Sequence, residues 1–91
     1  MTSAYINSVR AMGAALRQAR LDAGLTQEEL SAKAAVSRRW LGLVENGRVE
    51  GAEMGRVFQV LRALGIGVQL AEPPTPEGEA ARVAQLLEAR R

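Results

Sequence analysis

The 91-residue sequence contains no cysteine and no histidine. Without cysteine it can form neither a disulfide nor a thiolate metal site. Without histidine it lacks the usual ligand of zinc, copper and iron, and also the commonest general base. The carboxylates of Glu28 and Glu29 do not replace these groups, because adjacent residues on a helix point in different directions. The sequence therefore predicts no catalytic residue, no metal site and no cofactor, and hence no enzyme.

Aromatic residues and long apolar runs are also scarce. Tyr5, Trp40 and Phe58 are the only aromatic residues, and a core of aliphatic side chains favours packed helices over sheets. No apolar run reaches the ~18 residues of a membrane span. The opening MTSAYINSVR has neither the basic start nor the apolar stretch of a secretory signal. We therefore expect an all-α, cytoplasmic protein with no membrane partner.

The basic residues are concentrated in the first part of the chain. Residues 1–71 hold nine Lys or Arg against six Asp or Glu, a net charge of +3, whereas residues 72–91 hold three against four, a net charge of −1. The stretch Glu72–Pro76 has three prolines, which favour an extended linker. This division predicts a binding and dimerisation domain, residues 1–71, followed by a proline-rich linker and a C-terminal helical tail, residues 72–91.

Apolar residues recur at three- and four-residue steps, which predicts a bundle of four to five helices. The segments are about residues 9–23, 26–34, 37–46, 53–64 and 77–91. Thr26 and Glu29 form a capping-box pattern at the start of the second helix, and Ser37 can cap the third. The side chains expected to face inward are Val9, Met12, Leu16, Ala19, Ala23, Leu30, Ala34, Leu41, Val44, Met54, Val57, Phe58, Leu61 and Leu64.

One segment has the pattern of a β-strand. Ile66, Val68 and Leu70 alternate with Gly67 and Gln69. A lone strand cannot satisfy its own backbone hydrogen-bonding groups, so we expect this segment to pair with the same segment of a second subunit. A fifth short helix or an extended terminal segment is the alternative.

The connection between the second and third predicted helices is very short. Ala35 and Val36 leave no room for the helices to run antiparallel, so the helices cross steeply. The outer face of the third helix then points away from the body, where it can enter a DNA major groove. Because Leu41 and Val44 point inward, Arg38 lies on the opposite side and Arg39 on a flank.

Several polar residues of this segment are candidates for DNA contacts. Arg38 and Arg39 are candidates to read bases, since a guanidinium can donate two parallel hydrogen bonds to guanine. Gln27, near exposed backbone amides, is a candidate phosphate contact, and Lys33 and Arg48 can add further ones. Trp40 fits two roles equally well: a half-buried packing residue, or an interface residue with its indole N–H at a wet edge.

Residues 25–48, LTQEELSAKAAVSRRWLGLVENGR, resemble the helix-turn-helix of the phage-repressor superfamily, which is lambda- and Cro-like and also called the XRE family. The Leu-Thr-Gln-Glu-Glu-Leu start, the Val-Ser turn and the Glu-Asn-Gly-Arg end match that motif without an insertion. The stretches Val36–Leu41 and Gly55–Gly65, with the following strand segment, are further similar to HipB-type antitoxins. The resemblance covers about residues 9–71 and implies a lambda-repressor-like helical bundle.

The resemblance also implies roles for particular residues. Gln27 falls on the family's phosphate-contacting glutamine, Ser37, Arg38 and Arg39 fall on its base-reading positions, and Glu45 falls on its usual acidic residue. Three positions depart from the family: Ala35 replaces a glycine that permits a left-handed turn, and Gly42 and Leu43 replace polar residues. Base reading is therefore expected to be concentrated at the start of the helix.

For function, the resemblance implies a homodimer closed by paired strands through Ile66, Val68 and Leu70. Such a dimer binds a palindromic operator in double-stranded DNA, represses its own operon and neutralises a HipA-like serine/threonine kinase toxin. Two alternatives stay open: a stand-alone XRE-type regulator, or a protein-interaction module with vestigial DNA binding. The tail either docks on the toxin or frays.

Overall fold

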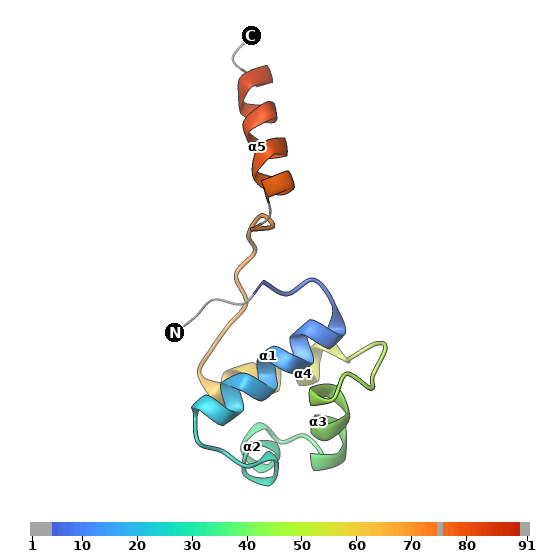
Figure 1. Cartoon of the computed structure of the whole chain (residues 1–91). Coiled ribbons are helices and arrows are strands. Elements are labelled where there is room, and N and C mark those ends of the chain that lie inside the picture. The colour runs from blue at the N-terminus through green and yellow to red at the C-terminus, as the bar shows by residue number, and fades with distance from the viewer. Residues whose placement is uncertain (1–4, 75, 90–91) are drawn as a thin grey trace.

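The computed structural model describes residues 5–74 and 76–89. Within these ranges the chain forms five helices: α1 (Val9–Asp22), α2 (Gln27–Ala34), α3 (Arg38–Glu45), α4 (Met54–Leu64) and α5 (Pro76–Ala89). The first four pack into a bundle, and α5 lies apart from it beyond an extended segment (Figure 1). This arrangement confirms the expected all-α class.

Side-chain caps begin the first three helices, and those of α2 and α3 lie at the predicted residues. The hydroxyl of Ser8 accepts from the Ala11 amide at 3.0 Å, and that of Ser37 accepts from the Trp40 amide at 3.0 Å. At α2 the Thr26 hydroxyl accepts from the Glu29 amide while the Glu29 carboxylate accepts from the Thr26 amide, so the capping box is complete. Each cap satisfies amides that a helix start leaves without intrahelical partners.

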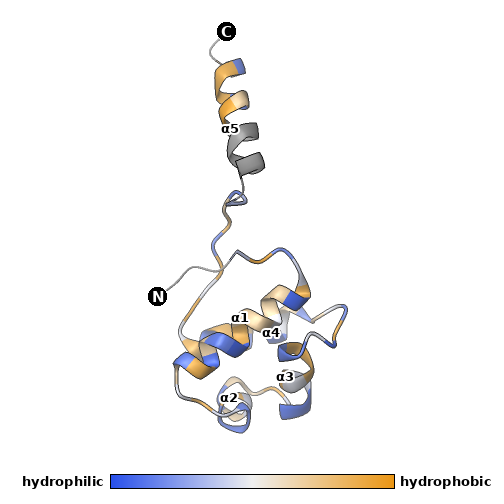
Figure 2. Ribbon diagram, in the orientation of Figure 1, coloured by the Kyte–Doolittle hydropathy of each residue, from blue (hydrophilic) through white to orange (hydrophobic). Residues whose placement is uncertain are grey.

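The core lies where these four helices meet. α1 packs against α3 and α4, and α2 packs against the same two helices. The fully buried side chains are aliphatic, and the hydropathy colouring shows hydrophobic and hydrophilic residues on each of the four helices (Figure 2). The buried apolar residues are Leu16, Leu30, Ala34, Leu41, Val44, Val57, Val60 and Leu61.

The predicted inner face of α4 was partly wrong. Met54 is 55% exposed and Phe58 is 40% exposed, whereas Val60, which the sequence pattern did not include, is fully buried. The helix therefore turns the face of Val57, Val60 and Leu61 toward the core. Period alone did not separate these two faces, because apolar residues occur on both.

The segment expected to be a strand takes no regular structure. Residues 66–70 are neither helix nor strand, and the described part of the chain contains no strand at all. The Ile66 amide is used by a bond to the Leu61 carbonyl, 3.0 Å long, that closes the end of α4. Val68 is 51% exposed and Leu70 is 94% exposed. Within one chain the strand expectation is thus not met, and pairing with a second subunit stays a prediction.

The last helix has an uncovered apolar side. Val83, Leu86 and Leu87 are all more than half exposed, and the later part of α5 is coloured hydrophobic (Figure 2). No helix formed by the described residues is long and apolar enough to cross a membrane.

Candidate nucleic-acid interface

The turn between α2 and α3 is tight because one alanine takes a left-handed conformation. Ala35 has φ 58° and ψ 42°, a region that strains a residue with a Cβ. The Val36 amide donates to the Ser31 carbonyl at 3.0 Å, which closes the turn. The chain thus makes a left-handed turn with alanine, as the sequence resemblance predicted.

A residue of α4 supports this turn. The Gln59 side-chain amide donates to the Ala34 carbonyl at 3.2 Å and reaches the Ala35 carbonyl at 3.5 Å. These carbonyls lie at the end of α2, where a helix leaves acceptors without partners. Sequence reasoning missed Gln59, because nothing local marks a bond between residues 25 positions apart.

The turn directs α3 so that one side is buried and the other is free. Leu41 and Val44 are at most 1% exposed, whereas Arg38 and Arg39 are exposed in the first turn. Neither guanidinium forms an ion pair or a hydrogen bond with the residues that the structure describes. Two cations therefore stand free at the capped start of a helix whose inner face is fixed.

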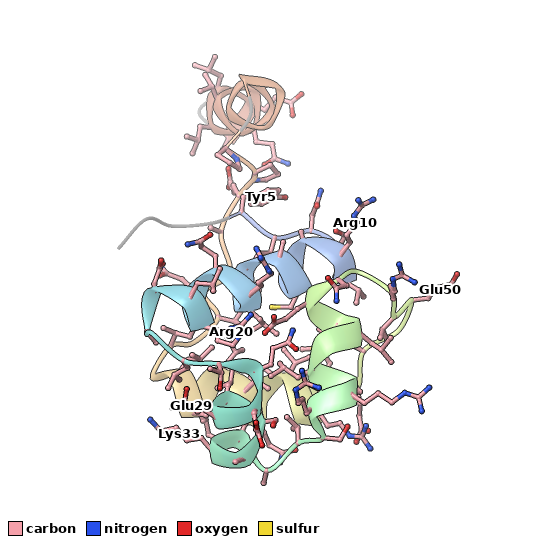
Figure 3. All side chains as sticks on the ribbon, turned by 60° about the horizontal axis from the view of Figure 1, so that its bottom comes forward. Tyr5, Arg10, Arg20, Glu29, Lys33 and Glu50 are labelled. Atoms are coloured by element: carbon pink, nitrogen blue, oxygen red, sulfur yellow. The ribbon has the colours of Figure 1, made fainter. Side chains whose placement is uncertain are left out.

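The other end of α3 is held by a buried ion pair that the sequence did not predict. The Arg20 guanidinium donates from Nε and Nη2 to the two oxygens of the Glu45 carboxylate, each at 2.9 Å, and from Nη1 to the Leu25 carbonyl at 2.8 Å. Arg20 lies near the centre of the bundle (Figure 3). The paired Glu45 carboxylate raises the pKa of Arg20. One signal was present: Arg20 follows Leu16 by four residues and so shares its inner face.

Gln27 is attached to this pair. Its side-chain amide donates to Glu45 Oε1 at 3.1 Å, and a Cβ on Gly42 would lie 3.6 Å from Gln27 Oε1. The Gln27 side chain, predicted to contact a phosphate, is thus fixed against α3 by this hydrogen bond. The Gln27 side-chain amide lies next to Gly42, one of the positions that depart from the predicted family pattern.

Gly13 lets α1 approach α3 at the same place. A Cβ added there would overlap the Val44 carbonyl oxygen. The backbones of α1 and α3 therefore pack in direct contact at Gly13. Gly13 and Arg20 both belong to α1, so the contact at Gly13 brings the end of α3 near Arg20.

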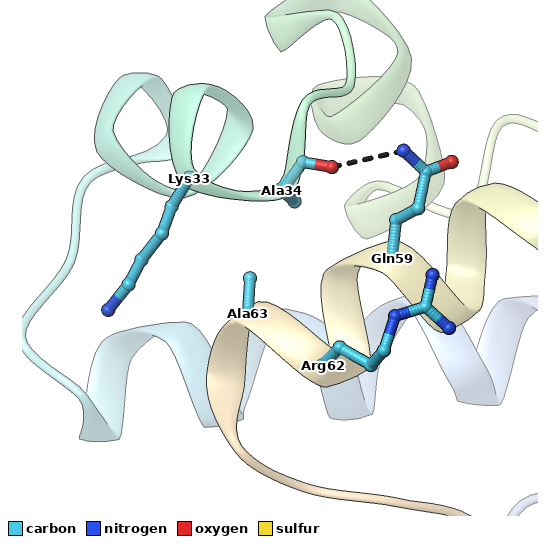
Figure 4. Close-up of a pocket in the computed structure, with 5 residues that line it drawn as sticks. All are labelled: Lys33, Ala34, Gln59, Arg62 and Ala63. Atoms are coloured by element: carbon cyan, nitrogen blue, oxygen red, sulfur yellow. Dashed lines mark hydrogen bonds between the residues drawn. The ribbon is translucent and has the colours of Figure 1, made fainter.

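The remaining predicted residues fall in different places. Ser37 caps α3, and Arg48 is exposed just beyond it, with its amide bonded to the Leu43 carbonyl at 2.9 Å. Lys33 lies elsewhere, in an open groove between α2 and α4 that it lines with Gln59 and Arg62 (Figure 4).

Trp40 takes the packing role left open by the sequence. It is half-buried and packs against the core. A guanidinium from α4, that of Arg56, lies over its ring.

Two short capped helices joined by a left-handed turn, the second with its outer face free, define a helix-turn-helix. The chain belongs to the helix-turn-helix domain family, whose model matches residues 11–73. No curated protein matches the sequence.

Solved structures of HipB share this fold. A HipB–O4 20mer complex superposes with a TM-score of 0.69 at 23% identity, covering 77% of this chain and 97% of the other. A chain of the structure described as a HipA–HipB–O2–O3 complex gives a TM-score of 0.68 at 23% identity, and the match covers 77% of this chain and 97% of that chain. A structure described as MDT protein gives a TM-score of 0.68 at 23% identity, and the match covers 77% of this chain and 97% of that chain.

Proposed function

We propose that this protein is a sequence-specific DNA-binding transcriptional repressor that acts as a homodimer. One observation carries the proposal: Arg38 and Arg39 are exposed and unpaired among the described residues, at the capped start of a helix whose inner side is buried. A guanidinium in that position can donate two parallel hydrogen bonds to guanine in the major groove.

The surrounding residues supply the backbone contacts of the proposal. Gln27, fixed by its bond to Glu45, faces one phosphate together with the free amides at the start of α2. Ser37 accepts from the Trp40 amide, so its hydroxyl hydrogen is available to a phosphate or a base. Arg48 lies past the other end of α3. Lys33 lines the groove toward α4 instead, and we leave it outside the proposed interface.

The dimer of the proposal uses Ile66, Val68 and Leu70. Val68 and Leu70 are strongly exposed and residues 67–70 are not in a helix, so this part of the segment is available for pairing, whereas the Ile66 amide already donates to the Leu61 carbonyl. Two modules related by a two-fold axis would read a palindrome whose half-sites lie about one helical turn apart. Residues 1–71 would form this unit, and residues 72–91 would form a linker and tail.

We further propose that the repressor is the antitoxin of a kinase toxin. The support is the likeness to HipB, which is part of a solved structure described as a HipA–HipB–O2–O3 complex, together with the sequence resemblance to HipB-type antitoxins. The uncovered apolar side of α5 offers a surface for such a partner. A stand-alone regulator has the same helix-turn-helix and differs only in lacking the toxin.

The DNA-binding test begins with selection of bound duplexes from a random-sequence pool by the wild-type chain. Gel shifts then compare the selected duplex with a scrambled one. Arg38→Ala with Arg39→Ala should abolish the preference for the selected duplex, because each lost bidentate contact removes about 1–3 kcal/mol of discrimination. The control is Arg62→Ala, which removes an exposed arginine from the groove between α2 and α4. A preference that survives the double substitution would refute base reading by these residues.

The antitoxin role has a separate test. The protein encoded by the neighbouring reading frame is expressed alone and with this chain, and growth and complex formation are measured. Growth arrest by a kinase-like neighbour that this chain relieves, with a complex on gel filtration, supports the antitoxin. Selective DNA binding without any such neighbour identifies a stand-alone regulator, and no selective DNA binding at all leaves the protein-interaction module.

A further inference from the structure

An arginine of α4 is held against the first turn of α3. The guanidinium carbon of Arg56 lies 5.8 Å from the centre of the Trp40 ring, within the range of a cation–π interaction. Trp40 is the third residue of α3 and directly follows Arg38 and Arg39. Its half-buried ring therefore holds the Arg56 guanidinium at the first turn of α3, the turn that also carries Arg38 and Arg39.

The ionic partner of Arg56 is weakly held. Glu53 Oε2 lies 3.3 Å from Arg56 Nε, and the two side chains are 68% and 48% exposed. Water and salt screen an ion pair that is this exposed. The two terminal nitrogens of Arg56 form no bond with the described residues. The guanidinium is thus positioned by stacking and yet free to exchange its carboxylate for another anion.

We propose that Arg56 binds a backbone phosphate of DNA at the edge of the groove that α3 enters, and that Glu53 competes with this phosphate. The inference rests on the proposed function. If Arg38 and Arg39 face base edges, the phosphates flank them across a groove about 12 Å wide, and Arg56 stands beside the same helical turn. A guanidinium binds phosphate through two parallel hydrogen bonds. The Glu53 carboxylate carries the same charge as the phosphate and lies 3.3 Å from Arg56 Nε, so it opposes phosphate binding at this guanidinium.

Arg62 provides a matched control on the same helix. It lines the groove with Lys33, between α2 and α4, and has no contact with Trp40 among those that the structure shows (Figure 4). Arg56→Gln and Arg62→Gln each remove one exposed positive charge from α4. A general effect of net charge would therefore change DNA binding equally in the two variants.

The test measures binding of the full chain to the selected duplex and to a random 20-base-pair duplex at several salt concentrations. Losing one phosphate contact should lower the slope of log K against log salt by about one and weaken binding roughly five-fold near physiological salt. We expect this change for Arg56→Gln on both duplexes, and none for Arg62→Gln. Arg56→Lys keeps the charge and should restore most of the slope.

Glu53 is tested by a double-substitution cycle. Glu53→Gln should strengthen binding to the random duplex, because the competing carboxylate is gone, and this gain should vanish when Arg56→Gln is also present. Fluorescence of the single tryptophan, Trp40, should change on DNA binding less in Arg56→Gln than in wild type. Thermal melting of each variant excludes loss of the fold.

Three results would overturn the proposal. The first is a salt slope that Arg56→Gln leaves unchanged, while the wild type still prefers its selected duplex. This result would refute the phosphate contact by Arg56 but not the proposed repressor function. The second is an equal loss in Arg56→Gln and Arg62→Gln. The third is a wild-type chain that binds neither duplex, which refutes the repressor as well.

Discussion

Arg20 and Glu45, from α1 and the last turn of α3, are joined by two hydrogen bonds of 2.9 Å between guanidinium and carboxylate. The pair is buried and has two further partners: Arg20 Nη1 donates to the Leu25 carbonyl, and Glu45 Oε1 accepts from the Gln27 side-chain amide. No buried side-chain nitrogen or oxygen among the described residues lacks a hydrogen bond. The pair thus links the body of the bundle to both helices of the helix-turn-helix.

Glu45→Gln should destabilise the fold by about 3 kcal/mol. The substitution keeps the shape but leaves the buried Arg20 cation without its counter-charge, which is the costly case for a buried pair. Unfolding in urea, followed by circular dichroism, measures the change. Glu53→Gln removes the carboxylate of an exposed ion pair instead and should cost less than about 1 kcal/mol. Equal losses in the two variants would contradict a structural role for the buried pair.

Gly13→Ala should destabilise the protein although alanine favours a helix. The new Cβ would overlap the Val44 carbonyl, and separating two packed backbones typically costs about 1–3 kcal/mol. Gly55→Ala, in the first turn of α4, is the comparison, since its Cβ would meet nothing closer than 3.9 Å. That variant should gain up to about 1 kcal/mol. Melting temperatures of the two variants should therefore move in opposite directions, and a stabilised Gly13→Ala would show that α1 does not pack on α3 as described.

Acid should weaken the capping box of α2 through Glu29. The Thr26 amide, which donates to Glu29 Oε1 at 3.0 Å, lowers the pKa of that carboxyl below its ordinary value of 4.5. A lowered pKa in the folded state means that its contribution to stability is complete above the ordinary pKa and is lost as the pH falls through the folded value.

Glu29→Gln provides the measurement for this cap, because glutamine keeps the acceptor but does not titrate. We expect the difference in unfolding free energy between wild type and this variant to be constant at neutral pH and to change only in the acid range. Identical pH profiles for wild type and Glu29→Gln would contradict the assignment.

Val68→Pro should produce monomers. Proline has no amide hydrogen, so it cannot donate in a strand pair, and residue 68 is the middle of the predicted pairing segment. Sedimentation equilibrium measures the mass, and Ala71→Pro, just outside the segment, should leave the dimer intact. A Val68→Pro chain that stays dimeric would mean that another surface, such as the exposed side of α5, holds the two subunits together.

Most of the helical framework was predictable because its signals are local. The capping box at Thr26 and the cap at Ser37 need only residues three positions apart, and the inward direction of Leu41 and Val44 follows from helical period. The exposure of Arg38 and Arg39 follows from the same phase. The inner face of α4 was predicted less well, since Met54 and Phe58 are as apolar as the residues that are actually buried.

The sequence by itself determined where the helices begin, where they end, and which two arginines stand at the free start of α3, because those features depend on hydrogen bonds and periodicity within a few residues. Only the tertiary structure decided that Arg20 pairs with Glu45, that Gln59 supports the turn, that Gly13 is a contact point and that Arg56 stacks on Trp40. Each of these joins residues far apart in the chain, and their meeting depends on how the helices cross, which no local pattern encodes.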